Sequence, residues 1–232
     1  MDNTLIISIH GLRTKEEDPT EWQPEFDHWL RKNENYANQV GNHTLVHLPF
    51  SYGVVSIPTF LTIGLLMKLH LDKLASSYAV SKFSKFLREA IAAYPGYNVH
   101  IMAHSFGTWI TQETLKANDD LKVKTVNFYG GIVSSHIRDN YLDELLMLKQ
   151  VENFVVWCSH NDGVVRFAPP PYGHIGFWGA ITEDPVDRNQ PKWQPFEYLN
   201  LYNRFTTFGH CDYFVPDTFK TTMSDILNGP KQ

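Results

Sequence analysis

Residues 98–110 read Asn-Val-His-Ile-Met-Ala-His-Ser-Phe-Gly-Thr-Trp-Ile, and this stretch decides the fold. Its first half, 99–103, is a short apolar run of the kind that forms a buried strand, and residues from Ser105 to about Ala117 have the spacing of a helix. A serine followed two residues later by a glycine stands at the junction. The sequence therefore predicts a strand, a tight turn and a helix in immediate succession.

The same alternation continues in both directions along the chain. Apolar runs predict strands at 5–9, 44–50, 99–103, 123–129, 154–158 and 205–208. Helical spacing predicts helices at 22–30, 80–94, 105–117, 141–149 and 217–228. Parallel strands need crossover connections, and helical crossovers cover both faces of a sheet. We therefore expect a three-layer α/β fold with a mostly parallel central sheet of about six strands.

The composition is typical of one compact domain covering residues 1–232. Only 19% of the 232 residues are charged, against about 25% in an average soluble domain, so a sizeable core is expected. The formal net charge of −5 provides no basic surface for nucleic acid, which we exclude as a partner. The N-terminal stretch lacks the basic region and the long apolar run of a secretory signal, which predicts a cytoplasmic protein.

Ser105 is the strongest candidate for a reactive residue. The sequence Ala-His-Ser-Phe-Gly at 103–107 matches the nucleophile-elbow pattern, with alanine in place of its first glycine. In that motif the serine sits on a strained turn that lifts its hydroxyl above the sheet, and small residues on either side avoid clashes between strand and helix. A serine here is also an ordinary helix N-cap, but the strand-to-helix junction favours the catalytic interpretation.

A serine hydroxyl is a weak nucleophile unless a base accepts its proton, so a histidine and an acid are expected later in the chain. His210 has the best position, between the last predicted strand and the last helix; the other downstream histidines are His136, His160 and His174. Asp162 follows the fifth predicted strand and could orient the imidazole; the alternative acids are Asp139 and Asp143. We therefore predict a triad of Ser105, Asp162 and His210.

An acyl-transfer site also needs two N–H donors that bind the oxyanion. We predict the backbone N–H of Phe106, the residue after the nucleophile, and that of Leu12, in the loop after the first strand. Gly11 would let a substrate approach the backbone closely. We expect His10, Gly11 and His104 to contact the substrate.

The residues at these strand ends resemble those of the α/β-hydrolase superfamily, and the resemblance spans nearly the whole chain. It rests on His10-Gly11, the elbow at 103–107, Asp162 and Gly209-His210, and within the superfamily the chain resembles a small bacterial group similar to esterases and lipases. The resemblance implies an eight-stranded sheet or a trimmed version of it, here with six strands and a minimal cap. It also implies serine-dependent hydrolysis of an ester, thioester or amide through an acyl-enzyme.

Two segments have an unusual composition. In 54–71 the only Lys, Arg, Asp or Glu is Lys68, but Pro58 and Gly64 interrupt the apolar run, so we do not expect a membrane span. A lid, an apolar pocket wall and a peripheral membrane contact remain as alternatives for this segment. Residues 166–203 are rich in proline and aromatic residues, and we expect them to form a pocket lined by Phe177 and Trp178.

Together these features predict a serine esterase similar to lipases that cleaves a small acyl ester without a cofactor, since no metal-ligand spacing or glycine-rich phosphate loop is present. Two other classes fit the same sequence. One is a non-catalytic protein of this fold that docks to a membrane or a partner through 54–71. The other is an acyltransferase that uses the same Ser105.

Overall fold

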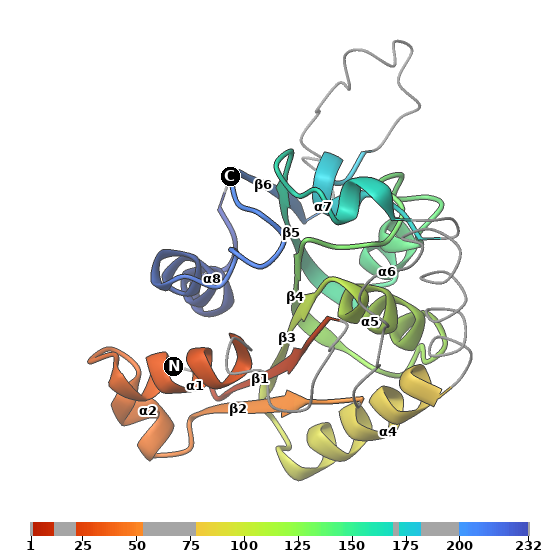
Figure 1. Cartoon of the computed structure of the whole chain (residues 1–232). Helices are drawn as coiled ribbons and strands as arrows, with labels where there is room; N and C mark the ends of the chain where they lie inside the picture. Colours follow the sequence, from red (N-terminus) through yellow and green to blue (C-terminus); the bar gives the residue numbers. More distant parts are fainter. Residues whose placement is uncertain (1, 12–21, 53–77, 169–171, 182–199, 232) are drawn as a thin grey trace.

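A computed structural model describes residues 2–11, 22–52, 78–168, 172–181 and 200–231. In this part of the chain, six strands form one sheet in the order β2-β1-β3-β4-β5-β6 (Figure 1). The strands are β1 (Thr4–Ile9), β2 (Leu45–Phe50), β3 (Asn98–His104), β4 (Val123–Tyr129), β5 (Val151–Ser159) and β6 (Leu201–Thr206). Every neighbouring pair is parallel, which confirms the predicted fold class.

Helices cover both faces of this sheet, as crossover connections between parallel strands require. One face carries α1 (Trp22–Lys32), α2 (Ala37–Gly41) and α8 (Pro216–Asn228) (Figure 1). The other face carries α4 (Tyr78–Ala93), α5 (Phe106–Lys116) and α6 (Leu142–Met147). The short helices η1 (Val165–Phe167) and α7 (Ile175–Trp178) lie between β5 and β6 in the chain, and α7 packs against β5.

The sheet separates two apolar cores. In β1, Ile7 faces the core formed with α4 and α5, whereas its neighbour Ile6 faces the core formed with α1 and α8. All six residues of β1 are buried, because a parallel strand covered on both faces has no solvent side. This explains why the strands read as continuous apolar runs and not as an alternation of apolar and polar residues.

The last strand does not lie where the sequence indicated. A strand at 205–208 was predicted, but β6 is Leu201–Thr206 and pairs with β5 from the register Phe154 to Leu201. Phe205, which suggested the strand, is 50% exposed. Because β6 is an edge strand with one neighbour, its position follows from pairing with β5 more than from its own apolar residues. The short helices α2 and α7 were not predicted either.

The segment 54–71 lies outside the described residues, so the three alternatives for it stay predictions. The same holds for residues 169–171 and 182–199 of the predicted pocket connection. Among the residues that the structure does describe, no helix has the length and apolar character needed to cross a bilayer.

Candidate active site

Ser105 occupies the turn between β3 and α5 in a strained backbone conformation. Its φ of 52° and ψ of −121° are values that residues with a side chain rarely adopt, at a cost of about 1–3 kcal/mol. The turn is held on both sides. The N–H of Ser105 donates to the carbonyl oxygen of Tyr129 at 3.0 Å, and the Thr108 hydroxyl donates to the backbone carbonyl oxygen of Ser105 at 2.6 Å. These bonds compensate for the strain and fix the direction of the Ser105 side chain.

The small residues around Ser105 are required by close packing against the end of β1. A Cβ atom on Gly107 would lie only 2.7 Å from the carbonyl oxygen of His10 and 2.9 Å from that of Ile9. A Cβ atom on Gly11 would lie 2.8 Å from the Cβ atom of Ser105 and 3.3 Å from its hydroxyl oxygen. Glycine at both positions therefore allows the first loop to pass directly beside the Ser105 hydroxyl.

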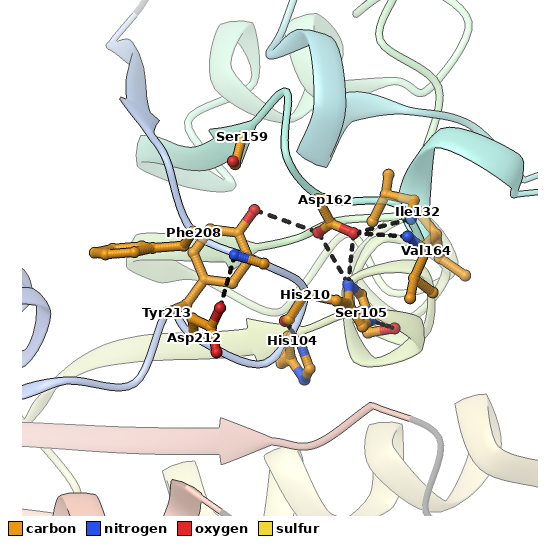
Figure 2. Close-up of polar contacts among 12 residues, drawn as sticks. His104, Ser105, Ile132, Ser159, Asp162, Val164, Phe208, His210, Asp212 and Tyr213 are labelled. Atoms are coloured by element: carbon orange, nitrogen blue, oxygen red, sulfur yellow. Dashed lines mark hydrogen bonds and ion pairs between the residues drawn. The ribbon is translucent and has the colours of Figure 1, made fainter.

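The structure brings Ser105, His210 and Asp162 into one hydrogen-bonded chain (Figure 2). Nε2 of His210 lies 3.0 Å from the hydroxyl oxygen of Ser105, and Nδ1 lies 2.9 Å and 3.1 Å from the two carboxylate oxygens of Asp162. Since a carboxylate can only accept, Nδ1 carries the proton and Nε2 accepts from the serine. This is the arrangement in which a histidine can remove a proton from a hydroxyl group.

Asp162 is fully buried but well supplied with hydrogen-bond donors. One of its oxygens accepts from the N–H groups of Val164 and Val165 at 3.2 Å and 3.0 Å, and the other accepts from the Tyr213 hydroxyl at 3.3 Å (Figure 2). Burial opposes ionisation of Asp162, but the hydrogen bond and charge interaction with His210 and the bond from Val165 outweigh it. The pKa of Asp162 therefore lies below its usual value, and the carboxylate is available to orient His210.

His104, a predicted substrate contact, contacts the backbone of His210. Its Nε2 donates to the carbonyl oxygen of His210 at 2.9 Å, and the two rings lie 4.8 Å apart. Burial lowers the pKa of His104 to about 3, so the ring is neutral at pH 7. The N–H of Gly209 also donates to the Asp212 carboxylate at 2.9 Å, and both bonds hold the loop that carries His210.

His10, the second predicted substrate contact among the histidines, is 1% exposed. Its Nδ1 donates to the carbonyl oxygen of Gly11, and its Nε2 lies 3.2 Å from the Ser51 hydroxyl oxygen. The ring stacks on Tyr52 at 4.4 Å, and the Tyr52 hydroxyl also donates to the carbonyl oxygen of Gly11. His10 and Tyr52 therefore support the loop beside Ser105 from behind.

The structure describes only one of the two predicted oxyanion donors. Phe106 is the first residue of α5, and the first N–H groups of a helix have no partner within that helix. Its N–H is therefore suited to bind an oxyanion next to Ser105. Leu12 lies outside the described residues, so its role stays a prediction.

Helix α7 packs directly on the strand end that contacts the acid and the base. A Cβ atom on Gly176 would overlap the backbone of Gly130 and Gly131. A Cβ atom on Gly130 would lie 2.9 Å from a carboxylate oxygen of Asp162 and 3.2 Å from Nδ1 of His210. The close approach of α7 thus depends on the glycine at 176, for which the sequence offered only the pattern Gly-His-Ile-Gly-Phe at 173–177.

Three of the rival residues, Asp143, His160 and His174, have other surroundings. His210 and Asp162 are the histidine and the acid bonded to each other at Ser105, whereas Asp143 caps the backbone N–H of Glu144. A cavity of about 400 Å³ has a lining that includes two of the rival histidines and both predicted pocket aromatics. Its lining residues are His160, Arg166, His174, Phe177 and Trp178. In the described ranges no group of three His, Cys, Asp or Glu side chains is arranged to hold a metal ion.

Comparison of the sequence with family models gives a match to an α/β hydrolase family of unknown function, over residues 52–164. The match includes the predicted nucleophile and acid. Comparison with curated proteins gives no significant match.

Solved structures resemble the chain in fold at low sequence identity. An uncharacterised Bacillus cereus protein has a TM-score of 0.55 and 13% identity; the alignment covers 99% of this chain and 61% of that protein. A Thermus thermophilus protein has a TM-score of 0.55 and 12% identity, with 96% and 87% covered. A cold-adapted esterase from an Arctic intertidal metagenomic library has a TM-score of 0.50 and 12% identity, with 98% and 80% covered. At these identities the likeness concerns the fold.

Proposed function

We propose that the chain is a serine hydrolase of the α/β-hydrolase superfamily that cleaves small carboxylic esters. The observation that carries the proposal is the contact of 3.0 Å between Nε2 of His210 and the hydroxyl of a serine held at a φ of 52°. A buried aspartate 2.9 Å from Nδ1 of the same ring supports it. A serine in this environment can act as a nucleophile, which an ordinary N-cap serine cannot.

The reaction follows from the direction of these hydrogen bonds. The Ser105 oxygen attacks the ester carbonyl carbon while its proton moves to Nε2 of His210. Asp162 stays ionised, stabilises the imidazolium and holds its orientation. His210 then gives the proton to the leaving alcohol as the ester bond breaks, which leaves an acyl group on Ser105. A water molecule, deprotonated by His210, hydrolyses this acyl-enzyme and restores the serine.

Negative charge develops on the carbonyl oxygen of the substrate in both steps. We assign the first donor to the N–H of Phe106, because it lies at the start of α5, where the positive end of the helix favours negative charge. We assign the second donor to the N–H of Leu12, in the loop that begins at Gly11. Because Gly11 has no side chain, no Cβ atom of this loop crowds the Ser105 hydroxyl.

Labelling with a fluorophosphonate probe, which reacts with activated serines, tests the mechanism. We expect the folded protein to be labelled on Ser105, as mapped by mass spectrometry, and Ser105→Ala to remove the label. Ser8→Ala is the matched control, because Ser8 also contacts a histidine but is fully buried, and it should be labelled like the natural protein. Folded protein that no serine-directed probe labels would contradict the proposal.

The substrate class is tested with p-nitrophenyl esters of increasing acyl length. We expect hydrolysis of short and medium chains, with release of the free acid in water. Cleavage of peptides alone would contradict the assignment to esters. Product formation only when an alcohol or amine acceptor is added would instead identify an acyltransferase that uses the same Ser105.

A further inference from the structure

The cavity beside Asp162 has a lining that none of the catalytic steps uses. Its volume of about 400 Å³ falls within the range of small-molecule sites, about 300–1,000 Å³. Two of its lining residues, His160 and Arg166, flank Asp162 in the loop after β5, and the others come from α7 and the residue before it. The backbone N–H of Arg166 donates to the carbonyl oxygen of Asp162 at 3.2 Å, so the cavity begins one turn away from the predicted acid.

Arg166 is the charged residue of this lining. Its guanidinium carbon lies 5.7 Å from the ring centroid of Phe167 and 5.8 Å from that of Phe177, which orients the group by cation–π contact. In the part of the chain that the structure describes, Arg166 forms no ion pair, whereas Arg31, Arg88 and Arg204 each pair with an aspartate. Its N–H donors are therefore available to a ligand.

The rest of the lining is aromatic or basic. The ring of His160 lies 5.2 Å from that of Phe177 and 5.5 Å from that of Trp178, and Trp178 is 42% exposed. Asp162 is the nearest acid in the loop, but its carboxylate is occupied by His210, Tyr213 and two backbone N–H groups. The cavity therefore combines flat apolar walls with a cationic group and no competing carboxylate among its described lining residues.

We propose that this cavity binds the anionic end of the substrate, so that the preferred substrate is an ester carrying a carboxylate or phosphate group on an apolar body. The guanidinium of Arg166 can bind such a group through two parallel hydrogen bonds, and the aromatic walls would pack against the apolar body. The statement about substrate rests on the proposed esterase function. Binding of the anion itself does not require Ser105, and the two can be tested separately.

The binding test uses Ser105→Ala protein and isothermal titration calorimetry at low salt. The probes are 3-phenylpropionate, the neutral 3-phenylpropionamide and phenyl phosphate. We expect the better of the two anions to bind at least tenfold more tightly than the amide, and the comparison of the two anions shows which group the cavity prefers. Arg166→Gln should abolish this preference, and Arg138→Gln, which removes an exposed arginine elsewhere, should keep it. Equal binding of the anions and the amide would overturn the proposal.

The kinetic test compares mono-(4-nitrophenyl) adipate with 4-nitrophenyl hexanoate, which have acyl chains of equal length. We expect Arg166→Gln to lower kcat/KM for the anionic ester at least tenfold and that for the neutral ester less than twofold. An equal effect on both esters, or no effect on either, would contradict the proposal for the substrate. If neither ester is cleaved but anion binding still depends on Arg166, the esterase function fails while the anionic cavity stands.

Discussion

The molecule contains a serine, a histidine and an aspartate in contact at two places, and the two groups differ in what they can do. In the first, His210 lies 3.0 Å from the Ser105 hydroxyl and 2.9 Å from Asp162. In the second, Nε2 of His47 lies 2.7 Å from the Ser8 hydroxyl and Nδ1 lies 3.6 Å from Asp27. The residue types and their order of contact are the same in both.

The second group differs in backbone and in access to solvent. Ser8 lies inside β1, is fully buried and is paired with both β2 and β3. The side-chain amide of Gln23 in α1 donates to its carbonyl oxygen at 2.8 Å and to its hydroxyl at 3.0 Å. Ser8 therefore connects α1 to the sheet, and no substrate can reach it.

The acid of the second group is also engaged elsewhere. Asp27 is bonded to Arg31 at 2.7 Å, whereas its distance of 3.6 Å from His47 exceeds that of a hydrogen bond. The comparison teaches that residue types alone do not make a nucleophile. A serine on a strained turn at the end of a strand is needed as well; Ser105 is 8% exposed there, whereas Ser8 is 0% exposed.

The largest expected effect is on activity. We expect Ser105→Ala to lower kcat/KM for esters at least about 10³-fold, because the members of a triad act as a unit. Ser8→Ala should change it less than twofold. A steady-state assay of both variants with p-nitrophenyl butyrate measures the difference. A comparable loss in Ser8→Ala, in protein that is still folded, would show that the second group takes part in catalysis.

Substitutions of Asp162 and of Asp27 should differ in their effect on activity nearly as strongly as those of the two serines. Asp162→Asn should lower kcat about 10³-fold to 10⁴-fold, because an amide donor facing Nδ1 favours the wrong tautomer of His210. Asp27→Asn should leave kcat within twofold. Unchanged activity in Asp162→Asn would mean that another acid, such as Asp139 or Asp143, orients the base.

For stability, substitution of Ser8 should have a larger effect than substitution of Ser105. Ser8→Ala should lower the free energy of unfolding by about 1–3 kcal/mol, because it leaves the buried Nε2 of His47 without its hydrogen-bond partner. Ser105→Ala should change it by less than about 0.5 kcal/mol, since His210 lies at the partly open site. Urea titration of both variants tests this, and an equal loss in both would contradict it.

Acid should weaken the fold through buried histidines. Burial lowers the pKa of His100 and of His104 to about 3 and lowers that of His47, whereas an unfolded chain protonates histidine near 6.5. Stability is therefore fully present above about pH 6.5 and falls as the pH drops towards 3. For His104 alone the loss between pH 6.5 and 5 is about 2 kcal/mol. Urea titrations at pH 7, 6 and 5 should show a shallower fall in His47→Gln than in the natural protein.

The smallest expected effect concerns the backbone conformations at Ser105 and Ser8. At Ser105, where φ is 52°, glycine should be more stabilising than alanine by about 1 kcal/mol, because glycine adopts this conformation without strain. At Ser8, in an extended strand, glycine should be less stabilising than alanine by about 0.5–1 kcal/mol. Thermal unfolding of the four variants measures both differences. The same sign at both serines would mean that the turn at Ser105 is not strained.

Much of the fold could be predicted from the sequence, since five of the six strands and the five longer helices lie within a few residues of the predicted positions. Their apolar runs are continuous because both faces of a parallel sheet are buried. Helix α7 was missed because its four residues are too few for a helical period, and its place depends on Gly176, which packs against the backbone of Gly130 and Gly131. His10 and His104 were predicted to contact the substrate, and nothing in the sequence indicated that both rings are buried.

The sequence by itself determined the α/β alternation, the elbow at Ser105 and the order in which an acid and a histidine follow it. Only the tertiary structure decided which side chains meet. His210 reaches Ser105 across 105 positions of sequence and Asp162 across 48, and His47 reaches Ser8 across 39. The physical reason is that the sheet order and register determine which segments of the chain become neighbours in space. They bring residues after β3, β5 and β6 to the same edge of the sheet, and they leave Ser8 inside a covered strand.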